Sequence, residues 1–154
     1  MTLKLTWMLL SLVTVIGASL PAQACSYDGQ FNNPFTESFP GSLDIAIATQ
    51  HAIDNNHLTK IDKLEGKQGL RRTSWWLQLM AEQHADALES VAYIYLVDIH
   101  LWSKVNPGKP MEIHATPQVE NTTSVLLLSE AALYALVYNS VDFDRATQLG
   151  IIHH

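Results

Sequence analysis

Apolar residues recur at helical spacing in two stretches of the first half of the chain. The first stretch begins at Ser42, whose hydroxyl is suited to cap a helix, and it ends near residue 55. The second covers about residues 72–88 and carries His84 on its apolar stripe. We therefore expect two helices separated by a charged connector over residues 59–69, with His84 facing or bordering the core.

The middle of the chain changes to a strand-like pattern. Residues 91–105 are rich in Val, Ile, Tyr and Trp and alternate towards their end, which predicts a β-strand. The turn-forming segment Asn106-Pro-Gly-Lys-Pro110 then leads into a short strand over residues 111–115. The two strands should form an antiparallel hairpin.

The turn length fixes the register of this hairpin. If residues 106–110 form the loop, Lys104 pairs with Glu112 and Trp102 pairs with His114. This register sets opposite charges side by side and gathers the apolar pairs on one face of the sheet. The other face is polar.

Three candidate metal ligands fall on that polar face. The register places Asp98, His100 and His114 on one side of adjacent strands. Zinc and copper accept two imidazoles and a carboxylate as ligands. Any solvated sheet face carries polar side chains at the same spacing, however. The pattern favours a plain exterior face and leaves a metal site as the alternative.

The last third of the chain combines one strand with two short helices. Residues 123–129 predict an apolar strand, and Ser129 is suited to cap the helix that follows it. Asp142 is suited to cap a second helix, which Gly150 should end.

This order of elements resembles the end of the sterol-carrier-protein-type lipid-binding domain. That family has a strand, a Ser or Thr, an acidic residue and a helix, followed by a Leu-Asp-x-x-x-Ala-x-x-x-Gly-like segment and a final strand. Val141, Asp142, Ala146 and Gly150 stand at the corresponding spacings here. The resemblance implies a curved antiparallel sheet and the binding of a lipid or another apolar molecule.

Together these patterns predict an α+β domain with an antiparallel sheet of about three strands packed against helices. An aromatic N-terminal loop and two helices precede the sheet. A pocket between sheet and helices would bind an apolar molecule, and tight packing of the same residues is the alternative. The candidate lining residues are Val97, Ile99, Leu101, Ile113, Leu126, Leu128, Leu133, Leu136 and Val137.

The first 24 residues have the pattern of a secretory signal peptide. Lys4 precedes an apolar run from Trp7 to Ile16, and small residues precede an expected cut between Ala24 and Cys25. The run is shorter than the roughly 20 apolar residues of a transmembrane helix. We therefore expect residues 25–154 to form one periplasmic or secreted domain with no transmembrane segment in the mature chain.

Cys25 is the single cysteine, so it cannot form an intramolecular disulfide. A cysteine directly after a signal cleavage site suggests lipidation and a membrane anchor. Lipoprotein signals usually place Leu where this chain has Ala22, so ordinary cleavage is favoured and lipidation of Cys25 is the alternative. Residues 25–41 mix aromatic side chains with turn formers, which predicts an ordered loop that straps the core or covers a pocket.

The net charge and the motifs of the sequence narrow the classes of function that this chain can have. The formal net charge is −6, and the only basic pair is Arg71-Arg72, which argues against nucleic acid as a partner. The sequence has no nucleophile elbow, zinc-protease motif or phosphate-binding Gly-rich loop, and it indicates no particular cofactor. Non-catalytic binding of an apolar small molecule or lipid therefore ranks first. The alternatives are a metal-binding protein and a structural or accessory partner-binding protein.

Overall fold

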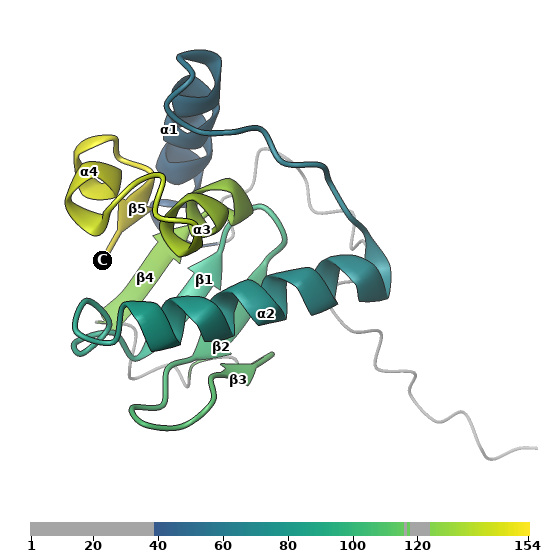
Figure 1. The fold of residues 1–154 in the computed structure, drawn as a ribbon, viewed down its shortest axis with the longest axis vertical. Helices are drawn as coiled ribbons and strands as arrows, with labels where there is room; N and C mark the ends of the chain where they lie inside the picture. The colour runs from purple at the N-terminus through teal and green to yellow at the C-terminus, as the bar shows by residue number, and fades with distance from the viewer. Residues whose placement is uncertain (1–38, 116, 118–123) are drawn as a thin grey trace, which may run out of the picture.

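The computed structural model describes residues 39–115, 117 and 124–154, which form an α+β fold (Figure 1). The helices are α1 (Ser42–Asp54), α2 (Gly66–Gln83), α3 (Glu130–Val137) and α4 (Phe143–Gln148). The strands are β1 (Tyr93–Leu96), β2 (Leu101–Lys104), β3 (Glu112–Ile113), β4 (Val125–Leu128) and β5 (Ile152–His153). Within these ranges, no helix is both long and apolar enough to cross a membrane. The predicted signal peptide, Cys25 and most of the aromatic loop lie outside the described residues.

The five strands form one mixed sheet in the order β3-β2-β1-β4-β5. Neighbouring strands are antiparallel except β1 and β4, which are parallel. The prediction of a three-stranded antiparallel sheet was therefore wrong in detail. It missed the β1–β4 pair, which joins segments that β2 and β3 separate in the sequence and which no local turn specifies.

The strand predicted over residues 91–105 is two strands in the structure. The chain turns at residues 97–100, so β1 folds back along β2 and Ile94 lies opposite Ser103. His100 ends this turn with a φ of 53°, a value uncommon outside glycine. The turn contains no Gly or Pro, which is why the sequence pattern did not reveal it.

The predicted register of the next hairpin is confirmed where β2 and β3 pair. Lys104 lies opposite Glu112, and Ser103 lies opposite Ile113. The strand expected over residues 111–115 shortens to two residues. His114 follows β3 in a turn with a φ of 64°, so it is not paired with Trp102 within the ladder.

Both faces of the sheet are covered. β1 and β4 are buried along their whole length, as expected for strands packed on two sides. One face packs against α2 and α3 (Figure 1) and carries Ile94, Leu96, Leu126 and Leu128. The opposite face contacts Ile45 of α1 and carries Tyr93, Tyr95, Val97, Val125 and Leu127, with Phe39 and Trp102 packed against them.

Side-chain capping sets the ends of α3 and α4 as predicted. The Ser129 hydroxyl accepts a hydrogen bond from the backbone N–H of Ala132 at 3.1 Å. The Asp142 carboxylate accepts one from the N–H of Arg145 at 2.7 Å. Gly150 follows α4 with a φ of 69°, the left-handed conformation that commonly ends a helix.

The first two helices differ from the prediction at their starts. Gly41 precedes α1, and no side chain caps this helix. The Ser42 hydroxyl is buried without a hydrogen-bond partner among the described residues, so the expected Ser42 cap was wrong. α2 begins at Gly66 and ends at Gln83, earlier than predicted at both ends. Burial of Gly69 within α2 shows that tertiary packing outweighs the low helix propensity of glycine here.

Candidate functional site

The three predicted metal ligands have separate surroundings. The Asp98 carboxylate accepts hydrogen bonds from the backbone N–H of Glu130 at 3.0 and 3.2 Å. His100 Nδ1 hydrogen-bonds with the Tyr95 hydroxyl at 2.8 Å, and His114 is exposed beyond β3. Across the described part of the chain, no three His, Cys, Asp or Glu side chains form a group that could hold a metal ion. The structure therefore does not bring these residues together as a ligand set.

The nine residues predicted to line an apolar pocket are divided between the two faces of the sheet. Val97 packs on the face that carries Tyr95, whereas the other eight belong to or pack against the core beneath α2 and α3. Within that core Leu128, Leu133 and Leu136 have no exposed area. None of the nine lines either of the two surface pockets described below. Seven of the nine are buried, and Ile99 and Ile113 are partly buried.

A polar network, in which Ser129 and Glu130 are buried, lies where the parallel strands β1 and β4 end. Asp98 follows β1 closely, and Ser129 and Glu130 follow β4. Glu130 is 4 % exposed, accepts a hydrogen bond from the Thr73 hydroxyl and lies 3.7 Å from the Arg72 guanidinium. Because ligands often bind beyond the carboxyl ends of parallel strands, this network is one candidate site.

Asp98 has a raised pKa at this junction. Loss of hydration raises the pKa of Asp98 from 3.8 to about 6; the hydrogen bonds from the Glu130 backbone oppose this rise, and the negative charge of the Glu130 side chain adds to it. The residue as a whole is exposed. Solvent screens charges at such positions, which limits the energetic effect of this shift.

The network is better explained as a structural joint. Thr73 and Arg72 of α2 hold Glu130 of α3, while Asp98 and Ser129 accept hydrogen bonds from backbone N–H groups in the first turn of α3. Both carboxylates thus already have partners. None of these residues lines either surface pocket. The arrangement fastens two helices to the sheet and presents no free acid or base to a cavity.

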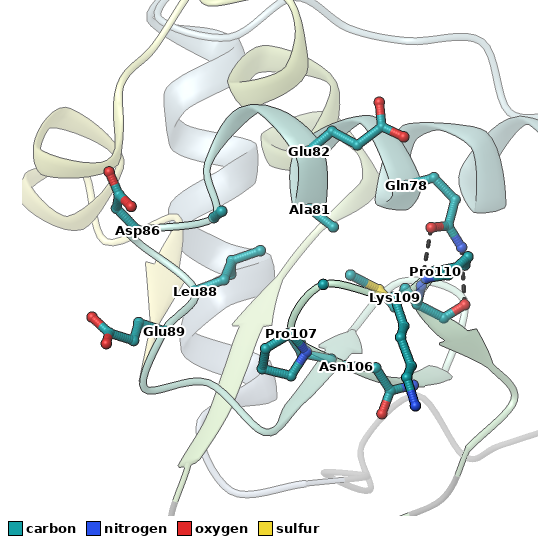
Figure 2. A pocket seen from close by; sticks show the side chains of 14 residues that line it. Gln78, Ala81, Glu82, Asp86, Leu88, Glu89, Asn106, Pro107, Lys109 and Pro110 are labelled. Atoms are coloured by element: carbon teal, nitrogen blue, oxygen red, sulfur yellow. Dashed lines mark hydrogen bonds between the residues drawn. The ribbon is translucent and has the colours of Figure 1, made fainter.

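A surface pocket of about 610 Å³ lies between the end of α2 and the loop that joins β2 to β3 (Figure 2). One wall consists of residues from α2 and the turn after it, between positions 78 and 89. The loop residues 105–111 form the other wall. The volume is within the range of about 300–1,000 Å³ that is usual for small-molecule sites.

The interior of this pocket is apolar. Leu88 and Met111 are 3 % and 4 % exposed, and the partly buried Ala81 and Val105 line it beside them. Figure 2 shows Leu88 and Ala81 directed into the hollow. An apolar group entering the pocket would therefore exchange water for hydrocarbon contacts, which is favourable.

Gln78 fastens the loop to α2. Its side-chain N–H donates to the Met111 carbonyl at 2.9 Å, and its side-chain oxygen accepts from the Met111 N–H at 3.0 Å (dashed in Figure 2). Pro107 and Pro110 restrict the backbone of the same loop. These bonds and prolines constrain the loop wall, and such a constraint lowers the entropic cost of binding.

Charged side chains surround the mouth of the pocket. Glu82, Asp86 and Glu89 belong to the α2 wall and Lys109 to the loop wall, and all four are exposed. Figure 2 shows the three acidic side chains directed outward from the hollow. The pocket therefore combines an excess of negative charge at its mouth with an apolar interior.

A second pocket, of about 420 Å³, lies beside α1 and the end of α4. Its lining includes the exposed side chains of Asp44, His51 and His57. Ala52 is the only buried residue that lines it. It offers a ligand less buried apolar surface than the pocket beside Gln78.

The sequence pattern did not indicate the pocket beside Gln78, although residues 106–110 were predicted to form a turn. Part of the signal was local, because Glu82, Asp86 and Glu89 are close together in the sequence and give this segment an excess of negative charge. The bond from Gln78 to Met111 spans 33 positions, and no local pattern predicts it.

Comparison of the chain with protein-family models, curated proteins and solved structures finds no match. The sterol-carrier resemblance stays a prediction from the sequence.

Proposed function

We propose that this protein binds a small apolar molecule, without catalysis, in the pocket between α2 and the β2–β3 loop. The observation that carries the proposal is a cavity of about 610 Å³ above the buried side chains of Leu88 and Met111. Ligand pockets typically have this size, an apolar lining and a few polar groups. The lipid ligands of the family that the C-terminal third resembles agree with this ligand class.

The chemistry of the lining supports binding. The side chains at the bottom of the hollow are hydrocarbon or thioether groups, and the Gln78 amide is already engaged with Met111. Each CH₂ group of a ligand that becomes buried contributes about 0.8 kcal/mol. Part of this energy is lost to ordering the ligand, so we expect short-chain ligands to bind with micromolar to millimolar dissociation constants.

We place this activity outside the cytoplasm. The support is the sequence of residues 1–24, which has the charged start, apolar run and small-residue exit of a secretory signal peptide. N-terminal sequencing of the protein recovered from its own compartment tests this location. A mature chain that begins at Cys25 agrees with export, whereas a chain that begins within the first twenty residues contradicts it.

Titration of the protein with octan-1-ol, followed by amide chemical shifts in NMR spectra, tests the binding function. We expect shifts to concentrate in residues 78–89 and 105–111, because both pocket walls would contact the probe. Replacement of Ala81 by Phe places a large ring in the hollow and should weaken binding by about tenfold, the effect of losing roughly two buried CH₂ groups.

The matched control is Ala46→Phe, which makes the same change at an exposed position of α1 that lines neither pocket. This variant should bind the alcohol as the wild type does. Shifts confined to other parts of the molecule, or equal binding by the Ala81→Phe and wild-type proteins, would refute the proposed site. Thermal unfolding of both variants identifies any loss of binding that comes from misfolding.

An accessory, partner-binding function is the second candidate. Two large aromatic side chains, Trp75 and Tyr138, are 54 % and 51 % exposed. Exposed aromatic residues are enriched where proteins contact one another. If octan-1-ol produces no chemical-shift changes in either pocket wall, partner binding becomes the better-supported function.

A further inference from the structure

We infer that the ligand is a cationic amphiphile, a small molecule that joins an apolar body to one positively charged group such as an amine. The inference rests on the binding function proposed above and concerns the charge of the ligand. It combines the apolar hollow with the distribution of charge around its mouth.

The hollow determines where the apolar body lies. Leu88 and Met111 form a buried floor, and the loop that Gln78 holds against α2 closes one side. No charged side chain points into this space in Figure 2. A charged group placed at the floor would lose its hydration without a compensating partner, which is costly. The charged end of an amphiphile must therefore lie at the mouth.

The charged side chains at the mouth determine which ligand charge is favoured there. Glu82, Asp86 and Glu89 line the α2 side, and Lys109 alone offsets them on the loop side. All four side chains are exposed, so they act through solvent over a screening length of about 8 Å at physiological salt. A cation is attracted to the α2 side of the mouth, whereas a carboxylate is repelled from it. The same acids increase the rate at which cations encounter the pocket.

Three probes that share one apolar chain separate charge from hydrophobicity. We expect octylamine to bind about fivefold more tightly than octan-1-ol, a difference typical of exposed charge interactions. Octanoate should bind most weakly of the three. Raising the ionic strength from about 0.01 M to about 1 M shortens the screening length to about 3 Å, so it should remove the advantage of the amine and leave the binding of the alcohol.

A variant that neutralises the three acidic side chains at the mouth, here called the rim variant, tests which residues select the cation. Glu82→Gln, Asp86→Asn and Glu89→Gln together should make octylamine and octan-1-ol bind equally, because the negative charge that separates the two probes is removed. The matched control carries Asp54→Asn, Asp62→Asn and Glu65→Gln. It removes the same number of exposed negative charges from positions that do not line the pocket, and it should retain the preference for the amine.

The outcomes distinguish this inference from the binding function on which it rests. Equal affinities of wild-type protein for amine and alcohol, or tighter binding of octanoate, overturn the cationic class and leave the apolar pocket intact. Failure of all three probes to shift the pocket walls overturns both. A preference for the amine that the rim variant retains also overturns the inference, because the acids would then not be its source.

Discussion

Asp98 and Glu130 bring two carboxylates to the first turn of α3, and each has a different partner. Asp98 accepts hydrogen bonds from the Glu130 backbone N–H, whereas the Glu130 side chain contacts Thr73 and Arg72 of α2. Helix N-termini favour negative charge, but two neighbouring carboxylates repel each other. The Arg72 guanidinium, 3.7 Å from the Glu130 carboxylate, supplies a positive charge at this joint.

We expect the ionisation of Asp98 to lower the stability of the folded state as the pH rises from 3.8 to about 6. Its pKa is raised from 3.8 to about 6 in the folded protein, so the folded state retains a proton that the unfolded chain has released. The resulting stabilisation is complete below pH 3.8 and is lost as the pH passes about 6. Exposure of the residue reduces the size of the effect.

Urea unfolding of the wild type and of Asp98→Asn across this pH range measures the effect. Asn cannot ionise, so the stability of the wild type relative to the variant should fall between pH 4 and pH 6 and then level off. A difference that stays constant with pH would show that the Asp98 carboxylate titrates alike in both states.

Among the elements, those that depend on local capping were predictable from sequence. Ser129, Asp142 and Gly150 fulfil their expected roles because a cap requires only residues of the same turn. The start of α1 shows the opposite case. Ser42 is a favourable capping residue by type, yet it lies inside the helix with Gly41 before it. The backbone conformation at a helix start decides which hydroxyl can cap it.

Two Ala substitutions separate a true cap from an apparent one. Asp142→Ala should lower the free energy of unfolding by about 1 kcal/mol, because the backbone N–H of Arg145 loses its acceptor. Ser42→Ala should change it by less than about 0.5 kcal/mol or increase it, since the buried hydroxyl has no hydrogen bond to lose among the described residues. Urea denaturation of both variants checks this. A larger loss in Ser42→Ala would restore the capping role.

The contact between α2 and the β2–β3 loop depends on Gln78. Replacing Gln78 by Ala removes two hydrogen bonds to Met111 and should cost about 1–3 kcal/mol of stability. We also expect faster amide hydrogen exchange in residues 105–111 and weaker octan-1-ol binding, because the loop wall loses its attachment. Gln68→Ala is the control, since Gln68 is exposed on the same helix and does not line the pocket. Unchanged exchange in Gln78→Ala would assign the rigidity of the loop to its prolines.

At the scale of the whole molecule, sequence pattern predicted the α+β class and the β2–β3 register but not the complete sheet. The Lys104–Glu112 pair followed from a turn that Pro and Gly mark clearly. The turn at residues 97–100 contains neither residue, and the parallel pairing of β1 with β4 depends on contacts between distant segments. The pocket was unpredictable for the same reason, because its two walls meet only in the folded chain.

Substitution of Ala by Leu at two positions tests whether this fold has its empty space in the core or at the surface. Ala132 of α3 has no exposed area and lies in the core where the sequence suggested a pocket, whereas Ala81 of α2 lines the surface pocket. Ala132→Leu should cost about 1–3 kcal/mol or more, because a packed core has no room for the added carbons. Ala81→Leu should change stability by less than about 0.5 kcal/mol, since its side chain extends into open space.

Urea unfolding of the two Leu variants decides between an interior and a surface cavity. If Ala132→Leu were tolerated as well as Ala81→Leu, the layer between the sheet and α3 would contain a void, and the interior pocket implied by the lipid-binding resemblance would be supported. If only Ala81→Leu is tolerated, the resemblance extends no further than the order of elements. The hollow beside Gln78, above Leu88 and Met111, is then the place where a ligand should be sought.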